Sequence, residues 1–139
     1  MSKDWVQDIK NMHDKFGVKS IIQNMDPKKL KKYLEFRLSC IQEEVTETND
    51  AFFIDKDPEE IVDGLIDTIV FSLGTLELFG IDVYKAWDTV LDPNMNKEPG
   101  IKLGRDNPFN LPDLLKPEGW KPPCHKDNCG IINKSLLGD

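Results

Sequence analysis

Apolar and polar positions recur with helical spacing along the first two thirds of the chain. Apolar residues every three or four positions predict an amphipathic helix over residues 4–16, ended by Gly17. Asp26-Pro27 combines a helix cap with a first-turn proline and predicts a long second helix over about residues 28–53. The main apolar stripe of this second helix is Leu30, Leu34, Leu38, Ile41, Val45 and Phe52.

Two more helices follow. Asp57-Pro58 predicts the start of a third helix, which stays apolar as far as Phe79. Asp82 predicts the cap of a shorter fourth helix, whose inner face carries Val83, Trp87, Val90 and Leu91 and which Pro93 closes. No segment alternates apolar and polar residues with a period of two, so we expect no strand. The pattern predicts an all-α four-helix bundle.

From Asn94 onward the helical pattern is replaced by turn sequences such as EPG, NPF, LPD and KPEG. We therefore expect two parts in the chain: a helical domain over residues 1–97, and an irregular, proline-rich extension over residues 98–139 packed on it. At 139 residues the chain is long enough for one ordinary domain with a core.

The formal net charge of −7 argues against a nucleic-acid or membrane partner, because an acidic surface repels phosphate groups and anionic lipids. No apolar run reaches the roughly 18–20 residues that span a bilayer, and the first residues lack a signal-peptide core. We expect a cytoplasmic protein. Three cysteines without an export signal indicate free thiols.

The third helix carries acids on a side that is otherwise apolar. Its conventional core stripe is Leu65, Ile69, Leu73 and Leu76. Glu60, Asp63 and Asp67 lie on a different side, at positions i, i+3 and i+7. That side also carries Val70, Phe71, Gly74 and Leu78, so we expect protein to cover it.

The second helix repeats this arrangement with Glu44 and Glu47, and Glu43 lies slightly further round. A short connection makes the two helices antiparallel and brings their acids opposite one another. Gathered carboxylates repel each other, and the sequence offers no nearby Lys or Arg except Lys56. Oxygen ligands without His or Cys point to Mg²⁺ or Mn²⁺. The simpler alternatives are a capping-box role for Glu60 and a solvated surface position for Glu43.

These acids also resemble a known family. EVTE at 44–47, EIVD at 60–63 and Asp67 resemble the ExxE…ExxD pattern of the all-α NTP pyrophosphohydrolases, the superfamily of MazG and phosphoribosyl-ATP pyrophosphohydrolase. Other blocks are similar to its stand-alone MazG-like branch, which includes phage members. They are MHDKFGV at 12–18, QEEVTE at 42–47, DGLIDTIVFSLGTLELFGID at 63–82, NMNK at 94–97 and KPEGWKPP at 116–123.

The resemblance implies which residues form the site. The catalytic carboxylates would be Glu43, Glu44, Glu47, Asp63 and Asp67. The same five residues and Glu60 are the candidate metal ligands, and Asn94, Asn96 and Lys97 are the candidate nucleotide and phosphate contacts. The family has one ExxD motif where this chain offers two acidic pairs, so the resemblance leaves open which acids of the third helix bind metal.

The resemblance implies a Mg²⁺-dependent enzyme that cleaves a nucleoside triphosphate, ribo or deoxy, into a monophosphate and pyrophosphate. One alternative is phosphoribosyl-ATP pyrophosphohydrolase, which uses the same chemistry. An alternative of another class is a non-catalytic nucleotide or metal sensor. Uncovered apolar faces on the second and third helices, together with the family, favour a homodimer or homotetramer.

Three further residues or motifs invite a functional interpretation. CHKDNC at 124–129 holds two cysteines and a histidine, but a structural zinc site takes four ligands, so we expect no zinc. Trp120 has the chemistry to stack on a base, although a Trp in a proline-rich tail more often anchors that tail. His13 is interpreted as a helix-surface or packing residue rather than a catalyst.

Overall fold

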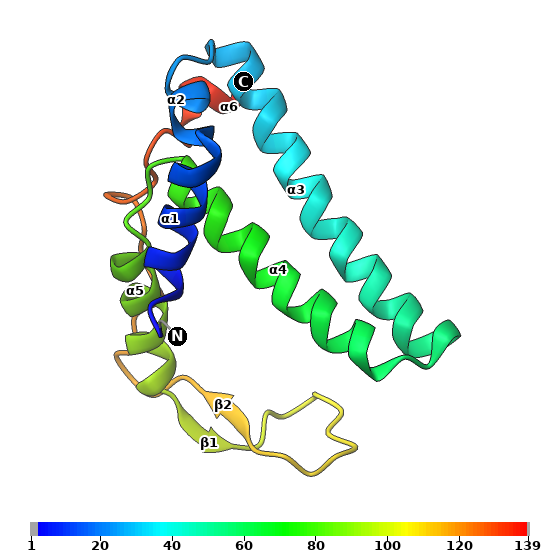
Figure 1. Ribbon diagram of the computed structural model, residues 1–139. Helices are drawn as coiled ribbons and strands as arrows, with labels where there is room; N and C mark the ends of the chain where they lie inside the picture. The colour runs from blue at the N-terminus through cyan, green and yellow to red at the C-terminus, as the bar shows by residue number, and fades with distance from the viewer. Residues whose placement is uncertain (1–2, 139) are drawn as a thin grey trace. The chain divides into compact units, whose positions relative to one another are not determined.

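The computed structural model describes residues 3–138 and is predominantly helical, which confirms the predicted all-α class (Figure 1). Its residues form two compact units. The helical unit comprises residues 3–83 and 129–138, and the tail unit comprises residues 84–128. These units do not coincide with the expected boundary after residue 97, because the fourth predicted helix groups with the segment that follows it.

The N-terminal helix α1 (Trp5–Phe16) forms where the apolar spacing predicted it. Its N-cap Asp4 accepts a hydrogen bond from the Gln7 N–H at 3.0 Å. Gly17 ends the helix in the left-handed conformation, with φ of 66°, which a residue without Cβ adopts easily. A short helix α2 (Val18–Gln23) follows at once, and the sequence pattern did not predict it.

The two long helices form an antiparallel pair (Figure 1). Helix α3 (Pro27–Asp50) begins at the Asp26 cap, whose side chain accepts from two backbone N–H groups. It continues as one π-helical turn, η1 (Ala51–Asp55), so the α-helix ends earlier than predicted. Helix α4 (Pro58–Leu78) begins in the same manner at the Asp57 cap.

The core of the helical unit lies where α1 packs on the C-terminal half of α4 and where the short helix α6 (Lys134–Leu137) packs on α3. Phe79 is fully buried and stacks on Tyr33 at a centroid distance of 6.2 Å. The Ile131 N–H donates to the Phe79 carbonyl at 2.9 Å, which ties the returning C-terminal segment to the end of α4. The other buried apolar residues include Ile9, Ile22, Leu30, Leu34, Cys40, Leu78 and Leu136.

Both predicted core stripes become more exposed along the α3–α4 pair toward η1. On α3, Leu34 is buried, but Leu38 and Phe52 are each 56% exposed. On α4, Leu73 is half-buried, whereas Leu65 is 56% exposed. In the single chain, each stripe is therefore buried over only part of its length. Helix α1 is too short to cover the end of the pair near η1.

The tail unit contains two short strands and all of α5 (Val83–Met95) except its first residue. The helix runs two residues beyond its predicted end at Pro93, and its predicted inner residue Trp87 is exposed. Strands β1 (Glu98–Gly100) and β2 (Asp113–Leu115) pair antiparallel, so the expectation of no strand is wrong. Strands of three residues are too short to show a period-two pattern. The Asp113 carboxylate accepts from the Lys102 N–H at 3.0 Å.

Candidate active site

Helices α3 and α4 approach each other closely beside their acids. A side chain on Gly64 would meet the hydroxyl of Thr48, and it would lie 3.5 Å from the carbonyl oxygen of Glu44. The Thr48 hydroxyl itself donates to that carbonyl at 2.6 Å. Glycine at position 64 therefore lets the two backbones come together at the level of Glu44.

Five carboxylates from the two helices form what we call the acid cluster: Glu43, Glu44, Glu47, Asp63 and Asp67. Glu44 and Asp67 are half-buried and the other three are exposed. Burial raises the pKa of the Glu44 carboxyl above its usual range, and the negative charges of Asp67, Glu47, Asp63 and Glu43 raise it further. The acids of both helices are thus close enough for their charges to act on Glu44, as the antiparallel arrangement predicts.

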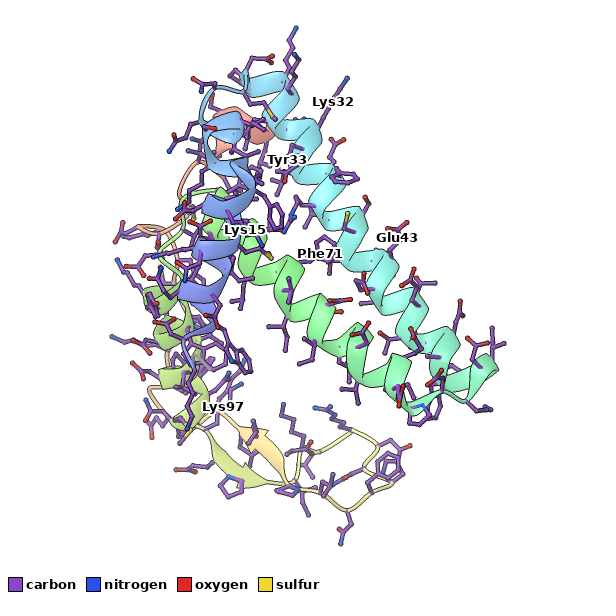
Figure 2. All side chains as sticks on the ribbon, viewed as in Figure 1. Lys15, Lys32, Tyr33, Glu43, Phe71 and Lys97 are labelled. Carbon is purple, nitrogen blue, oxygen red and sulfur yellow. The ribbon has the colours of Figure 1, made fainter. Side chains whose placement is uncertain are left out.

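The acid cluster has no compensating ion pair in the described part of the chain. Within residues 3–138, no Lys or Arg forms an ion pair with a member of the acid cluster. Arg37 precedes the acids of α3 in the sequence, but its guanidinium is bonded to α4. It donates to the Thr75 hydroxyl at 3.0 Å and to the Phe71 carbonyl at 3.1 Å, and it lies over the Phe71 ring, which Figure 2 labels.

The donor set of the acid cluster fits a hard divalent cation, because every donor is a carboxylate oxygen and the half-buried Glu44 is destabilised as an anion. As the side chains stand in the described part of the chain, no three His, Cys, Asp or Glu residues converge closely enough to hold a metal ion. Glu43, labelled in Figure 2, points outward from α3. Metal binding would therefore require carboxylates of the cluster to rotate toward one another.

Glu60 is placed differently from the acid cluster. It is exposed in the first turn of α4, and its backbone N–H donates to the Asp57 carboxylate at 3.3 Å. Its charge is not among those that raise the pKa of Glu44. An open groove of about 400 Å³ lies beside Asp63, and it is lined by Pro58, Glu59, Val62, Asp63 and Ile66.

The candidate phosphate contacts lie together in the tail unit, where α5 ends. The Lys97 N–H donates to the Asn94 carbonyl at 3.2 Å, and the Asn96 N–H donates to the Asp92 carbonyl at 3.1 Å. These bonds fold residues 94–97 into a compact turn that precedes β1. Asn94 and Asn96 are exposed and Lys97 is half-buried.

Sequence reasoning missed a buried charge group made by three helices. His13 of α1 is buried, and its Nδ1 lies 2.5 Å from a carboxylate oxygen of the buried Glu77 of α4. Lys19 of α2 forms an ion pair with the other oxygen of Glu77. A lone acid in the apolar segment 68–81 was the signal in the sequence. The structure shows His13 as a buried polar residue that joins α1 to α4.

Trp120 and the three cysteines are the remaining residues that the sequence analysis singled out. The Trp120 indole N–H donates to the Pro93 carbonyl at 2.7 Å, so this side chain anchors the tail to α5. Cys124 and Cys129 are exposed, and Cys40 is buried. The absence of zinc from CHKDNC stays a prediction.

Comparison with known proteins identifies one family. A family model described as phosphoribosyl-ATP pyrophosphohydrolase matches residues 10–94, which include the C-terminal half of α1, all of α3 and α4, and the whole acid cluster. No curated protein and no solved structure is significantly similar to the chain. In the described part of the chain, no single helix is long and apolar enough to cross a membrane. The helices α4 and α5 reach such a length only when they are added together across the turn between them.

Proposed function

This chain belongs to the phosphoribosyl-ATP pyrophosphohydrolase family, and we propose that within the all-α NTP pyrophosphohydrolase superfamily it acts on nucleoside triphosphates. This superfamily also includes the MazG-like proteins. Membership in it identifies the chain as a pyrophosphohydrolase. The proposed reaction joins water to the α-phosphate, breaks the bond between the α and β phosphates, and releases a nucleoside monophosphate and pyrophosphate.

The observation that carries this proposal is the gathering of five carboxylates from α3 and α4 beside the close approach at Gly64, where no Lys or Arg of residues 3–138 forms an ion pair with any of them. Burial and the neighbouring negative charges raise the pKa of Glu44 within this group. Such a group repels a triphosphate by itself, and it holds divalent cations that attract one. Bound Mg²⁺ or Mn²⁺ would neutralise the phosphates, lower the pKa of a water molecule and stabilise the leaving pyrophosphate. Glu44, Glu47, Asp63 and Asp67 are the residues that we expect to hold it, and Glu60 is a peripheral candidate.

The carboxylates also have a role in proton transfer. A carboxylate that is not fully used as a metal ligand accepts the proton of the attacking water. Glu43 and Glu47 are the candidates, because both are exposed and reach solvent beside the half-buried Glu44. Lys97, Asn94 and Asn96 then supply a cation and amide groups for the phosphates of the nucleotide.

Phosphoribosyl-ATP is the second candidate substrate, and the description of the matching family model favours it. The nucleoside triphosphate proposal is supported by NMNK and KPEGWKPP, which resemble blocks of the stand-alone MazG-like branch. Both reactions break the same type of bond, so the acid cluster serves either substrate.

We also propose that two copies of the chain associate through α3 and α4. The end of this pair near η1 exposes large apolar side chains that a soluble protein normally covers. They include Phe52, Phe53, Val62, Leu65 and Ile66, and each is at least 48% exposed. Phe36 and Leu38, nearer the start of α3, are also more than half exposed. A dimer or a dimer of dimers would bury these residues and enclose the acid cluster near the subunit boundary.

Product analysis tests the proposed function. The protein is incubated with Mg²⁺ and, separately, with each ribonucleoside and deoxyribonucleoside triphosphate and with phosphoribosyl-ATP, and the products are separated by chromatography. We expect a monophosphate and pyrophosphate from at least one triphosphate. Cleavage of phosphoribosyl-ATP alone would favour the second candidate, and binding without cleavage would favour a sensor.

A further inference from the structure

Two lysine ammonium groups lie over the indole ring of Trp120. Nζ of Lys97 lies 5.3 Å from the centroid of the indole ring, and Nζ of Lys116 lies 4.9 Å from it. The ring is fixed in place, because its N–H donates to the Pro93 carbonyl at 2.7 Å. Two cations from distant parts of the sequence therefore meet at one anchored aromatic side chain.

The strand register explains why these lysines meet. Glu98 pairs with Leu115 at one end of the β1–β2 ladder. Lys97 immediately precedes β1 and Lys116 immediately follows β2, so the two lysines are neighbours across the open end of this ladder. Figure 2 labels Lys97 at the point where α5 gives way to β1. Like charges in such cross-strand positions repel each other.

No carboxylate in residues 3–138 forms an ion pair with either lysine. The indole offers each ammonium only a weak attraction. An anion bound between the two lysines would remove their repulsion and gain a charge-assisted hydrogen bond from each of them.

We propose that Lys97 and Lys116 form a binding site for a chain of phosphate groups, with Trp120 as the residue that positions both lysines. The anion site rests on the tail-unit geometry alone. Its assignment to the triphosphate of the substrate, or to the pyrophosphate released from it, rests on the proposed function. Lys116 thus becomes a further phosphate-binding residue. Trp120 uses its ring to hold cations rather than to stack on a base.

Calorimetric titration of the full-length protein with pyrophosphate tests this inference, in one buffer with EDTA and in another with Mg²⁺. We expect Lys116→Gln to weaken pyrophosphate binding by at least about fivefold, because one charge-assisted contact is lost. Lys121→Gln is the matched control, since Lys121 is an exposed lysine of the same segment. It should bind pyrophosphate within about twofold of wild type.

Two Trp120 variants test the positioning role. Trp120→Phe keeps an aromatic ring for the lysines and should keep more of the pyrophosphate affinity than Trp120→Ala. With a cleaved nucleotide, Lys116→Gln should raise KM and leave kcat nearly unchanged, which a purely structural lysine would not do. Inorganic phosphate, titrated in parallel, should bind more weakly than pyrophosphate, because a single phosphate group offers the two ammonium groups less negative charge.

Three outcomes would overturn the proposed anion site. They are equal affinity of Lys116→Gln and wild type for pyrophosphate in both buffers, an equal loss in Lys121→Gln, and no pyrophosphate binding by the wild type. If wild type cleaves no nucleotide but binds pyrophosphate through Lys116, the anion site stands and the proposed function fails. If wild type cleaves nucleotides and Lys116→Gln changes neither KM nor binding, the proposed function stands and this inference fails.

Discussion

The Thr48 hydroxyl of α3 lies where a side chain on Gly64 of α4 would begin. This contact sets the distance between the two helices directly beside the acid cluster. The carbonyl of Glu44 lies at the same level, 3.5 Å from that position. The separation of the carboxylates therefore depends on the absence of one methyl group.

Gly64→Ala should destabilise the protein by about 1–2 kcal/mol, because the clash with Thr48 outweighs the better helix propensity of alanine. It should also lower turnover, since it moves the acids of α4 away from those of α3. Urea unfolding and a turnover assay check both effects. The double variant Thr48→Ala/Gly64→Ala removes the obstructing hydroxyl and should recover stability. A single Gly64→Ala variant as stable and active as wild type would refute this role of the contact.

The local signals in the sequence predicted the helix starts well. Each cap is made by a side chain within three residues of the N–H groups that it accepts, as Asp26 and Asp57 show. The acid cluster was also predictable, because helical spacing and a short connection decide which residues face each other. The π-helical turn at Ala51–Asp55 and the three-residue strands leave no comparable periodic signal.

Burial and long-range pairing were less predictable. Leu65 and Leu73 have the same place in the helical pattern, yet one is exposed and the other half-buried, because α1 extends over only part of α4. The contact between His13 and Glu77 joins residues 64 positions apart and depends on how α1 crosses α4. Neither property is set by local spacing.

The buried Glu77 predicts a pH-dependent contribution to stability. Burial alone would raise the pKa of Glu77, but hydrogen bonds and positive charge from Lys19 and His13 lower it below its usual range. A lowered folded-state pKa stabilises the fold above the unfolded value of about 4.3, and this stability is lost as the pH falls through the folded pKa.

Glu77→Gln should therefore lower the free energy of unfolding more near neutral pH than in acid. In acid the wild-type Glu77 carboxylate is protonated, so wild type loses the stabilisation that the substitution removes. The measurement is urea unfolding of both proteins from about pH 7 down to pH 3.5, across the range where a glutamate titrates. Glu118→Gln, at an exposed position in the tail, is the control. A difference between wild type and Glu77→Gln that stays constant over this range would contradict the assignment.

Mg²⁺ should raise the melting temperature, because a cation bound only by the folded acid cluster stabilises the fold by mass action and relieves charge repulsion. Without metal, Glu44→Gln should melt above wild type, since it removes the carboxylate whose ionisation is disfavoured. It should then gain less from Mg²⁺ than wild type does. NaCl at matched ionic strength controls for screening. No Mg²⁺ shift in wild type, with or without nucleotide, would count against a metal-dependent site.

Light scattering should show a dimer or tetramer at micromolar concentration, because the apolar surface of α3 and α4 needs a cover. Leu65→Lys should shift the protein toward monomer by placing a charge on that surface. Leu103→Lys is the matched control: Leu103 is 99% exposed in the tail unit, and its substitution should leave the assembly unchanged. A fully active wild-type monomer would refute the proposed association.

Pyrophosphate release is the measurement on which the proposed enzyme depends. Wild type with Mg²⁺ and a cleavable nucleoside triphosphate should release pyrophosphate and monophosphate in equal amounts. Glu47→Gln should release pyrophosphate at less than about a tenth of that rate with its helical signal intact, because a carboxylate of the acid cluster is lost. Glu35→Gln, an exposed acid of α3 outside the cluster, should keep the wild-type rate. Orthophosphate as the first product, or a Glu47→Gln variant that keeps more than about a tenth of the rate, would contradict the proposed enzyme.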